Sequence, residues 1–221
     1  MNSTSLIFTL GLGFMLGLRH ATEADHVVAV ATIVSERRSV LASAVVGMYW
    51  GIGHTLSLLV AMLVVLALGT AIPEDIAGLL EFAVAVMIIG LGLRLLWVSA
   101  GAPARTLHLP DTSPGRAMPL RNGVKPLLIG AMHGLAGSAA LIVLIQAEIS
   151  RHGGLWQGLA YLLVFGVGSM IGMGLMGGAI GLPFTLKEGA APRLMRLLPQ
   201  LAGAGSVIFG LWYGWQTWPG G

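Results

Sequence analysis

A cluster of ionisable residues lies in the middle of the first long apolar segment of the chain. Segment 19–26 has the sequence RHATEADH, and five of its side chains can carry charge: Arg19, His20, Glu23, Asp25 and His26. Imidazole and carboxylate groups without a thiolate suit borderline divalent metal ions such as Ni²⁺, Co²⁺ or Zn²⁺. The same groups can relay protons, because histidine changes charge near neutral pH. The residue types therefore indicate either a metal path or a proton path.

The spacing of these residues sets a condition for a common site. At about 100° per residue in an α-helix, His20, Glu23 and His26 lie on one ridge, whereas Asp25 falls on nearly the opposite face. All four side chains can converge only if the helix is broken or unwound within this segment. In an unbroken helix, Asp25 would support the site from behind or pair with another helix. The purely structural alternative is a salt bridge, such as Arg19 with Glu23, that holds helices together.

The composition makes charge at this position informative. Of the 221 residues, 56% are hydrophobic and only 10% are charged, whereas soluble proteins have about 25% charged residues. The mean hydropathy of +0.86 and the 33 glycines are typical of closely packed membrane helices. They exclude a disordered chain, a disulfide scaffold and an ordinary soluble enzyme. A charge at the bilayer centre costs at least ~2.5–3.5 kcal/mol, so a cluster of ionisable groups there indicates a function.

Six apolar runs are long enough to cross a bilayer, for which about 20 residues are needed. They cover residues 5–34, 40–69, 76–99, 124–149, 155–182 and 196–218. With the N-terminus outside, ten of the 12 Lys and Arg residues fall on the inner side, which is a strong positive-inside bias. We therefore predict an all-α, multi-pass protein of the cell membrane with six spans and both termini outside. The pI of about 9.8 then reflects inner loops and not nucleic-acid binding.

The two halves of the chain resemble each other weakly. Segments 16–21 and 129–134 match, as do 49–54 and 164–169, and 89–91 and 209–211. Three spans per half is an odd number, so the second half must be inserted upside down, as in many secondary transporters. We predict a single transmembrane domain over 1–221, with repeat one at 1–100, a Pro-rich linker at 101–122 and repeat two at 123–221.

Other polar residues lie at a similar depth in later spans. His54 is at the centre of the second span, Ser169 is near the centre of the fifth, and His133 is somewhat to the inner side in the fourth. Ser138, close to His133, could suggest an intramembrane serine hydrolase. The chain lacks a G-x-S-x-G elbow, however, and serine in a Gly/Ala-rich helix is usually a packing residue. We therefore do not expect an enzyme.

These motifs resemble those of a known family. Segment 19–26 is similar to the R-H-A-x-D-A-D-H signature of the nickel/cobalt permeases, and GIGHT at 51–55 is similar to the L-G-H-S/T element of their next helix. The resemblance is to the shorter branch, the urease-accessory or high-affinity nickel-transport membrane proteins, and covers nearly the whole chain. It also includes segments 131–141, 165–169 and 180–184.

The resemblance implies roles for individual residues. His20, Asp25 and His26 would be central to metal recognition, Glu23 stands where the family usually has Asp, and His54 matches the second element. The later acidic D-T-x-T-E type element of the longer permeases is absent, and the central loop has a single histidine where many relatives are His-rich. These departures leave the identity of the metal open.

We therefore predict a permease for a divalent transition-metal ion, Ni²⁺ or Co²⁺ first, with the ion as substrate and no permanently bound cofactor. The expected ligands are His20, Asp25, His26 and His54. The residues expected along the path or in support of the ligands are Arg19, Glu23, His133 and Ser138. Besides the ion, the expected partners are membrane lipid and either a second copy of the chain or metalloenzyme maturation proteins.

Two alternatives stay open at this stage. The first is a proton-coupled exporter of a small anion, with Arg19 as the anion contact and the histidines as a proton relay. The second is a maturation partner that binds the metal without translocating it.

Overall fold

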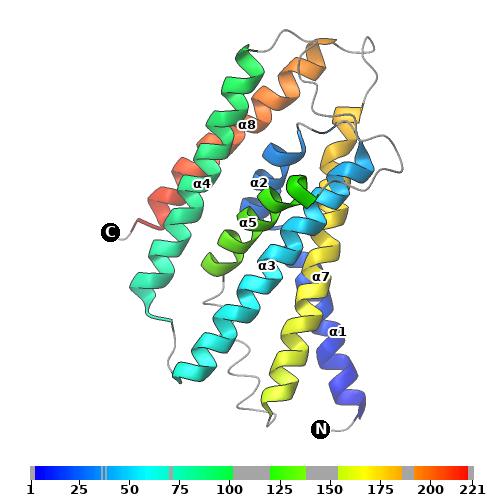
Figure 1. Cartoon of the computed structure of the whole chain (residues 1–221), viewed down its shortest axis with the longest axis vertical. Helices are drawn as coiled ribbons and strands as arrows, with labels where there is room; N and C mark the ends of the chain where they lie inside the picture. The colour runs from blue at the N-terminus through cyan, green and yellow to red at the C-terminus, as the bar shows by residue number, and fades with distance from the viewer. Residues whose placement is uncertain are drawn as a thin grey trace.

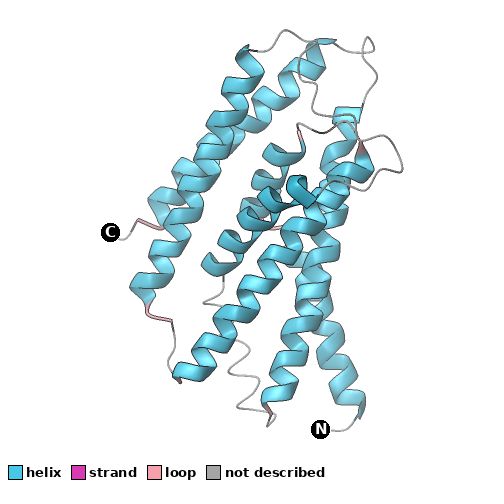
Figure 2. Cartoon of the chain, in the orientation of Figure 1, coloured by secondary structure: helices cyan, strands magenta, loops and turns pink. Residues whose placement is uncertain are grey.

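The computed structural model describes residues 3–35, 37, 39–69, 72–101, 120–137, 154–185 and 192–218. The predicted all-α class is confirmed, because these residues form helices and short connections (Figures 1 and 2). The helices are α1 (Ser3–His20), α2 (Ala24–Val34), α3 (Val40–Leu68), α4 (Glu74–Gly101), α5 (Leu120–Ala136), α7 (Leu155–Gly181), the short 3-10 helix η1 (Leu182–Thr185) and α8 (Pro192–Gln216).

The first expected span is two helices rather than one. Helix α1 ends at His20, residues 21–23 form a turn, and α2 begins at Ala24. The turn is closed by backbone hydrogen bonds from Thr22 N–H to the Arg19 carbonyl (2.9 Å) and from Glu23 N–H to the His20 carbonyl (3.1 Å). Glu23 then has extended backbone angles (φ −64°, ψ 148°). The break that convergence of the side chains requires is therefore present.

Three helices within the described residues are long and apolar enough to cross a membrane: α3, α4 and α7 continued by η1. They coincide with the second, third and fifth expected spans. Helices α1 and α2 are shorter because the break divides them. Helix α5 covers only the first part of the expected fourth span, and the rest of that span lies outside the described residues, as does most of the linker. The chain is a membrane protein.

Helix α3 is at the centre of the packing. It lies against both α5 and α7, while α1 packs along α7, α4 pairs with α8, and α2 contacts α7 and α8. Glycines make the closest approaches possible: a Cβ at Gly17 of α1 would overlap the backbone of α7, and one at Gly130 of α5 would overlap the backbone of α3. In Figure 1 the starts of α1, α4 and α7 lie toward one end of the molecule, and the end of α2 and the start of α3 lie toward the other.

Candidate metal-binding site

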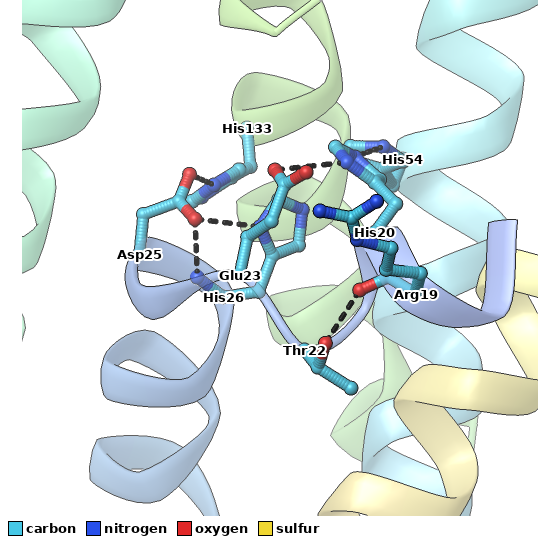
Figure 3. Close-up of polar contacts among 8 residues, drawn as sticks. All are labelled: Arg19, His20, Thr22, Glu23, Asp25, His26, His54 and His133. Carbon is cyan, nitrogen blue, oxygen red and sulfur yellow. Dashed lines mark hydrogen bonds and ion pairs between the residues drawn. The ribbon is translucent and has the colours of Figure 1, made fainter. Parts of the chain in front are cut away.

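The break between α1 and α2 brings polar side chains from four helices to one place (Figure 3). His20 comes from the end of α1, Asp25 and His26 from the first turn of α2, His54 from the middle of α3, and His133 from α5. Asp25 is also well placed on α2, because a carboxylate in the first turn of a helix interacts favourably with the helix dipole. Residues far apart in sequence thus form one polar cluster inside an apolar bundle.

Three imidazoles form the first part of this cluster. The ring centroids of His20 and His26 are 4.5 Å apart, those of His20 and His54 are 5.1 Å apart, and those of His26 and His54 are 5.2 Å apart. One ligand nitrogen from each ring lies within 4.8 Å of the other two. The Nε2 atoms of His20 and His54 are 3.1 Å apart. This arrangement can hold a transition-metal ion through imidazole nitrogens.

Asp25 lies on the other side of the His26 ring and connects it to His133. Its Oδ1 atom accepts hydrogen bonds from the backbone N–H of His26 (2.9 Å) and from His26 Nδ1–H (2.9 Å). Its Oδ2 atom accepts from His133 Nε2–H (2.8 Å). Both carboxylate oxygens are therefore engaged, and one aspartate fixes the orientation of two rings.

Glu23 supports the cluster in a similar way from the turn. His20 Nδ1 lies 2.9 Å from Glu23 Oε2, and the Glu23 side chain is 55% exposed. The Thr22 hydroxyl donates to the Arg19 carbonyl (2.6 Å), which also accepts from the Thr22 backbone N–H. Thr22 therefore stabilises the end of α1, and Glu23 holds the ring of His20.

Several buried nitrogens of this cluster have no hydrogen-bond partner within the described part of the chain. They are His26 Nε2, His54 Nδ1 and His133 Nδ1, and their side chains are nearly inaccessible. Buried polar atoms are normally paired, and an unpaired one calls for an explanation. His26 donates its Nδ1–H to Asp25 and therefore has a lone pair on Nε2, which suits this atom to metal coordination.

An open cavity of about 670 Å³ reaches this cluster. Its lining includes Arg19, His20, Glu23, Asp25 and His26 from the break, together with Glu81, Tyr161, Phe165 and Tyr213. Glu81 and Tyr161 lie near the starts of α4 and α7, and Tyr213 near the end of α8. The cavity therefore extends from the break toward the end of the molecule where α1 begins.

The structure brings together seven of the eight residues singled out from the sequence. Ser138 lies outside the described residues. His20, Asp25, His26 and His54 do not form one four-membered set: the groups that could hold an ion are His20, His26 and His54, and separately Asp25, His26 and His133. Glu23 contacts His20 rather than Arg19, and Arg19 is exposed at the cavity.

Three further residues lie at the site and were not predicted from the sequence. Trp50 stacks on His26 at 5.7 Å and meets His133 edge-on at 5.5 Å, Phe165 lies 5.4 Å from His20, and Glu81 lines the cavity. Trp50 is four residues before His54, one helical turn away on the same face. Phe165 has the same spacing to Ser169. An aromatic residue one turn before a polar residue at the centre of a span was therefore the sequence signal that could have placed Trp50 and Phe165 at the site.

Comparisons with known proteins agree with this chemistry. Residues 6–110 match the family described as high-affinity nickel-transport protein. The urease accessory protein UreH of Bacillus sp. (strain TB-90) is 35% identical over 216 residues, which cover 96% of this chain and 93% of that protein. The chloroplast proteins FOR GROWTH AND FERTILITY 1 and 2 of Arabidopsis thaliana are 26% and 25% identical over 89% and 93% of this chain, which spans 55% of each of them. No solved structure matches the chain.

Proposed function

Because the chain belongs to the high-affinity nickel-transport protein family, we propose that it is a permease that moves Ni²⁺ or Co²⁺ across the cell membrane. One observation carries the proposal: three imidazoles, His20, His26 and His54, converge beside a broken helix within an apolar bundle. The ion is the cargo and not a resident cofactor, and no chemical conversion accompanies its passage. Asp25 accepts a hydrogen bond from His26, so its negative charge lies directly behind one of the rings that would bind the ion.

The surroundings of these imidazoles favour a cation. The end of α1 carries the negative pole of the helix dipole, and in transporters the ends and unwound carbonyls of broken helices often bind cations. Glu23, Asp25 and Glu81 line the cavity that leads to the site. These carboxylates can offset the loss of hydration as the ion leaves water for the three nitrogens.

We propose the six-span, inverted-repeat architecture with both termini outside, as one transmembrane domain over 1–221. Close contacts between helices support the repeat. Gly17 lies against the carbonyl oxygen of Phe165, and Gly130 lies against the carbonyl oxygen of Trp50. The matches of 16–21 with 129–134 and of 49–54 with 164–169 pair Gly17 with Gly130 and Phe165 with Trp50, so the two contacts are equivalent.

A second pair of contacts supports the same correspondence. Gly53 lies against the carbonyl oxygen of Leu127, and Gly168 lies against the carbonyl oxygen of Phe14. Extending the same sequence match by two residues pairs Leu127 with Phe14. Helix α5 therefore packs on α3 as α1 packs on α7, which is what two related halves around an in-plane axis require.

Metal flux into sealed vesicles tests the proposed function. Protein reconstituted in liposomes should accumulate Ni²⁺ or Co²⁺, and the substitutions His20→Ala, His26→Ala and His54→Ala should each abolish accumulation. The substitution His108→Ala, in the Pro-rich sequence segment 101–122, is the matched control and should leave flux unchanged. Wild-type liposomes that accumulate neither ion, together with an anion flux that Arg19→Ala abolishes, would favour the anion exporter instead.

The urease accessory relative supports a second candidate, a partner that binds metal for enzyme maturation without translocating it. The same preparations distinguish the two. A permease accumulates the ion inside sealed vesicles well beyond one ion per chain. A non-translocating partner binds the ion in detergent at a fixed ratio but fills no vesicle lumen.

A further inference from the structure

His133 belongs to a second group of potential ligands on the far side of His26. Asp25, His26 and His133 each place one ligand atom within 4.8 Å of the others. The ring centroids of His26 and His133 are 4.3 Å apart, and Asp25 bonds to both rings. The His133 side chain is 2% exposed, and its Nδ1 atom has no partner among the described residues.

We propose that Asp25, His26 and His133 form a second coordination position for the transported ion, which reaches it from the first position through the shared ring of His26. This inference rests on the proposed function, because it divides the path of the same ion into two steps. The first position is the group of His20, His26 and His54, and the second takes the same class of ion, a borderline divalent transition metal.

The two nitrogens of His26 make the transfer possible. Its Nδ1 faces Asp25, whereas its Nε2 is buried without a partner. With the ion on Nε2, the N–H remains on Nδ1 and donates to Asp25, an arrangement common behind metal-bound histidines. With the ion on Nδ1, the His26 proton moves to Nε2. His133 then binds the ion through Nε2 and carries its proton on Nδ1, so the ion takes the place of both imidazole hydrogen bonds to Asp25. One ring carries one proton, so the two positions are occupied in turn.

Repeat symmetry assigns the two positions to the two halves. The match of 16–21 with 129–134 pairs His20 with His133, so each position holds the equivalent histidine of one repeat. His20, Asp25 and His26 line the open cavity, whereas His54 and His133 are absent from its lining. Trp50 is fully buried and contacts both His26 and His133. Each position therefore combines one buried histidine, His54 or His133, with residues that line the open cavity.

Binding and flux of one set of variants test the two positions. Isothermal titration in detergent measures Ni²⁺ binding, and proteoliposomes measure Ni²⁺ accumulation. We expect wild type to bind a single Ni²⁺ per chain. The substitution His133→Ala should keep this binding at the first position, which also shows that the variant is folded, while flux falls by at least the ~10–100-fold that altering an outer-shell partner of a metal ligand costs. His26→Ala should lose both binding and flux.

A conservative variant separates coordination from positioning. In His133→Gln the side-chain amide can still donate a hydrogen bond to Asp25, but it is a poor ligand for Ni²⁺. We expect flux to stay as low as in His133→Ala, with His108→Ala as the control for loss of a histidine. Recovery of flux in His133→Gln would reduce His133 to a positioning residue and overturn the second position.

Three further results would also overturn it: unchanged flux in His133→Ala, loss of all Ni²⁺ binding in that variant, or simultaneous binding of two ions by wild type. The first two results leave the proposed permease intact as long as the wild type transports Ni²⁺. A wild type that neither binds nor accumulates the ion would instead remove the proposed function itself.

Discussion

Asp25 accepts hydrogen bonds from two imidazoles and from the backbone N–H that follows it. Hydrogen bonds to a charged group are roughly twice as strong as those between neutral groups. They hold the rings of His26 and His133 in one orientation each and place the N–H of each ring on the nitrogen that faces Asp25. The opposite nitrogen of His26, Nε2, is then available as a lone pair, so the aspartate prepares this ring for the ion at the first position.

The substitution Asp25→Asn tests this preparation. Asparagine has a similar size, but its amide group cannot accept from both rings, so one ring loses its fixed orientation. We expect Ni²⁺ affinity, measured by isothermal titration in detergent, to fall about 10–100-fold. Asp75→Asn, at an exposed position near the start of α4, is the matched control. Equal affinities for wild type and Asp25→Asn would contradict the role given to Asp25.

Histidines in apolar segments identified much of the site from sequence. His20, His26 and His54 each interrupt a hydrophobic run. Burying an ionisable side chain in a membrane span costs free energy, so its presence there indicates a function. Trp50 and Glu81 gave no such signal. Tryptophan is common in membrane helices, and Glu81 lies near a span end, where a carboxylate can reach the interface. Only the packing of α3 and α4 around the break shows what these two side chains contact.

The break between α1 and α2 is the element on which the site depends. The sequence indicated that His20 and Asp25 can converge only if the helix is broken, but segment 19–26 contains neither Pro nor Gly, the usual causes of a sharp kink. The break is instead held by the hydrogen bonds of Thr22 and Glu23 and by contacts of Asp25 with α5. Contacts with a distant helix cannot be read from local propensity, so the sequence left both conformations open.

Helix α2 is tied to α8 by a buried pair of hydroxyl groups, and a double-mutant cycle can measure the tie. Thr32 and Ser206 are 2.5 Å apart, and Thr32 also donates to the Val28 carbonyl. We expect Thr32→Val and Ser206→Ala each to lower the free energy of unfolding, with a coupling of about 0.6–1.7 kcal/mol, from the average to the maximum found for hydrogen bonds between membrane helices. Equilibrium unfolding in mixed micelles measures it. Strictly additive effects would mean that the pair contributes nothing to α2–α8 association.

At the scale of the whole molecule, the equivalent glycine contacts make a quantitative test of the repeat. A methyl group at Gly17 or Gly130 would overlap a backbone carbonyl of the neighbouring helix, so Gly17→Ala and Gly130→Ala should each destabilise the protein by about 1–3 kcal/mol. Gly11→Ala and Gly90→Ala are matched controls, because a Cβ there meets nothing within 4 Å. Thermal unfolding in detergent measures the shifts. A large effect at one position and none at the other would argue against equivalent halves.

The arrangement of the halves also predicts which connections share a side of the membrane. The chain contains no cysteine, so single cysteines can be placed at the exposed residues Pro73, before α4, Pro183, in η1, and Trp218, after α8. With both termini outside, a membrane-impermeant maleimide should label Pro73→Cys and Trp218→Cys on intact cells, and Pro183→Cys only after permeabilisation. Retained Ni²⁺ uptake would show that each variant is folded. The reverse labelling pattern would mean that both termini lie inside. Labelling of Pro73→Cys and Pro183→Cys from the same side would mean that α7 does not run from the outer to the inner face. That result would contradict the upside-down insertion of the second half.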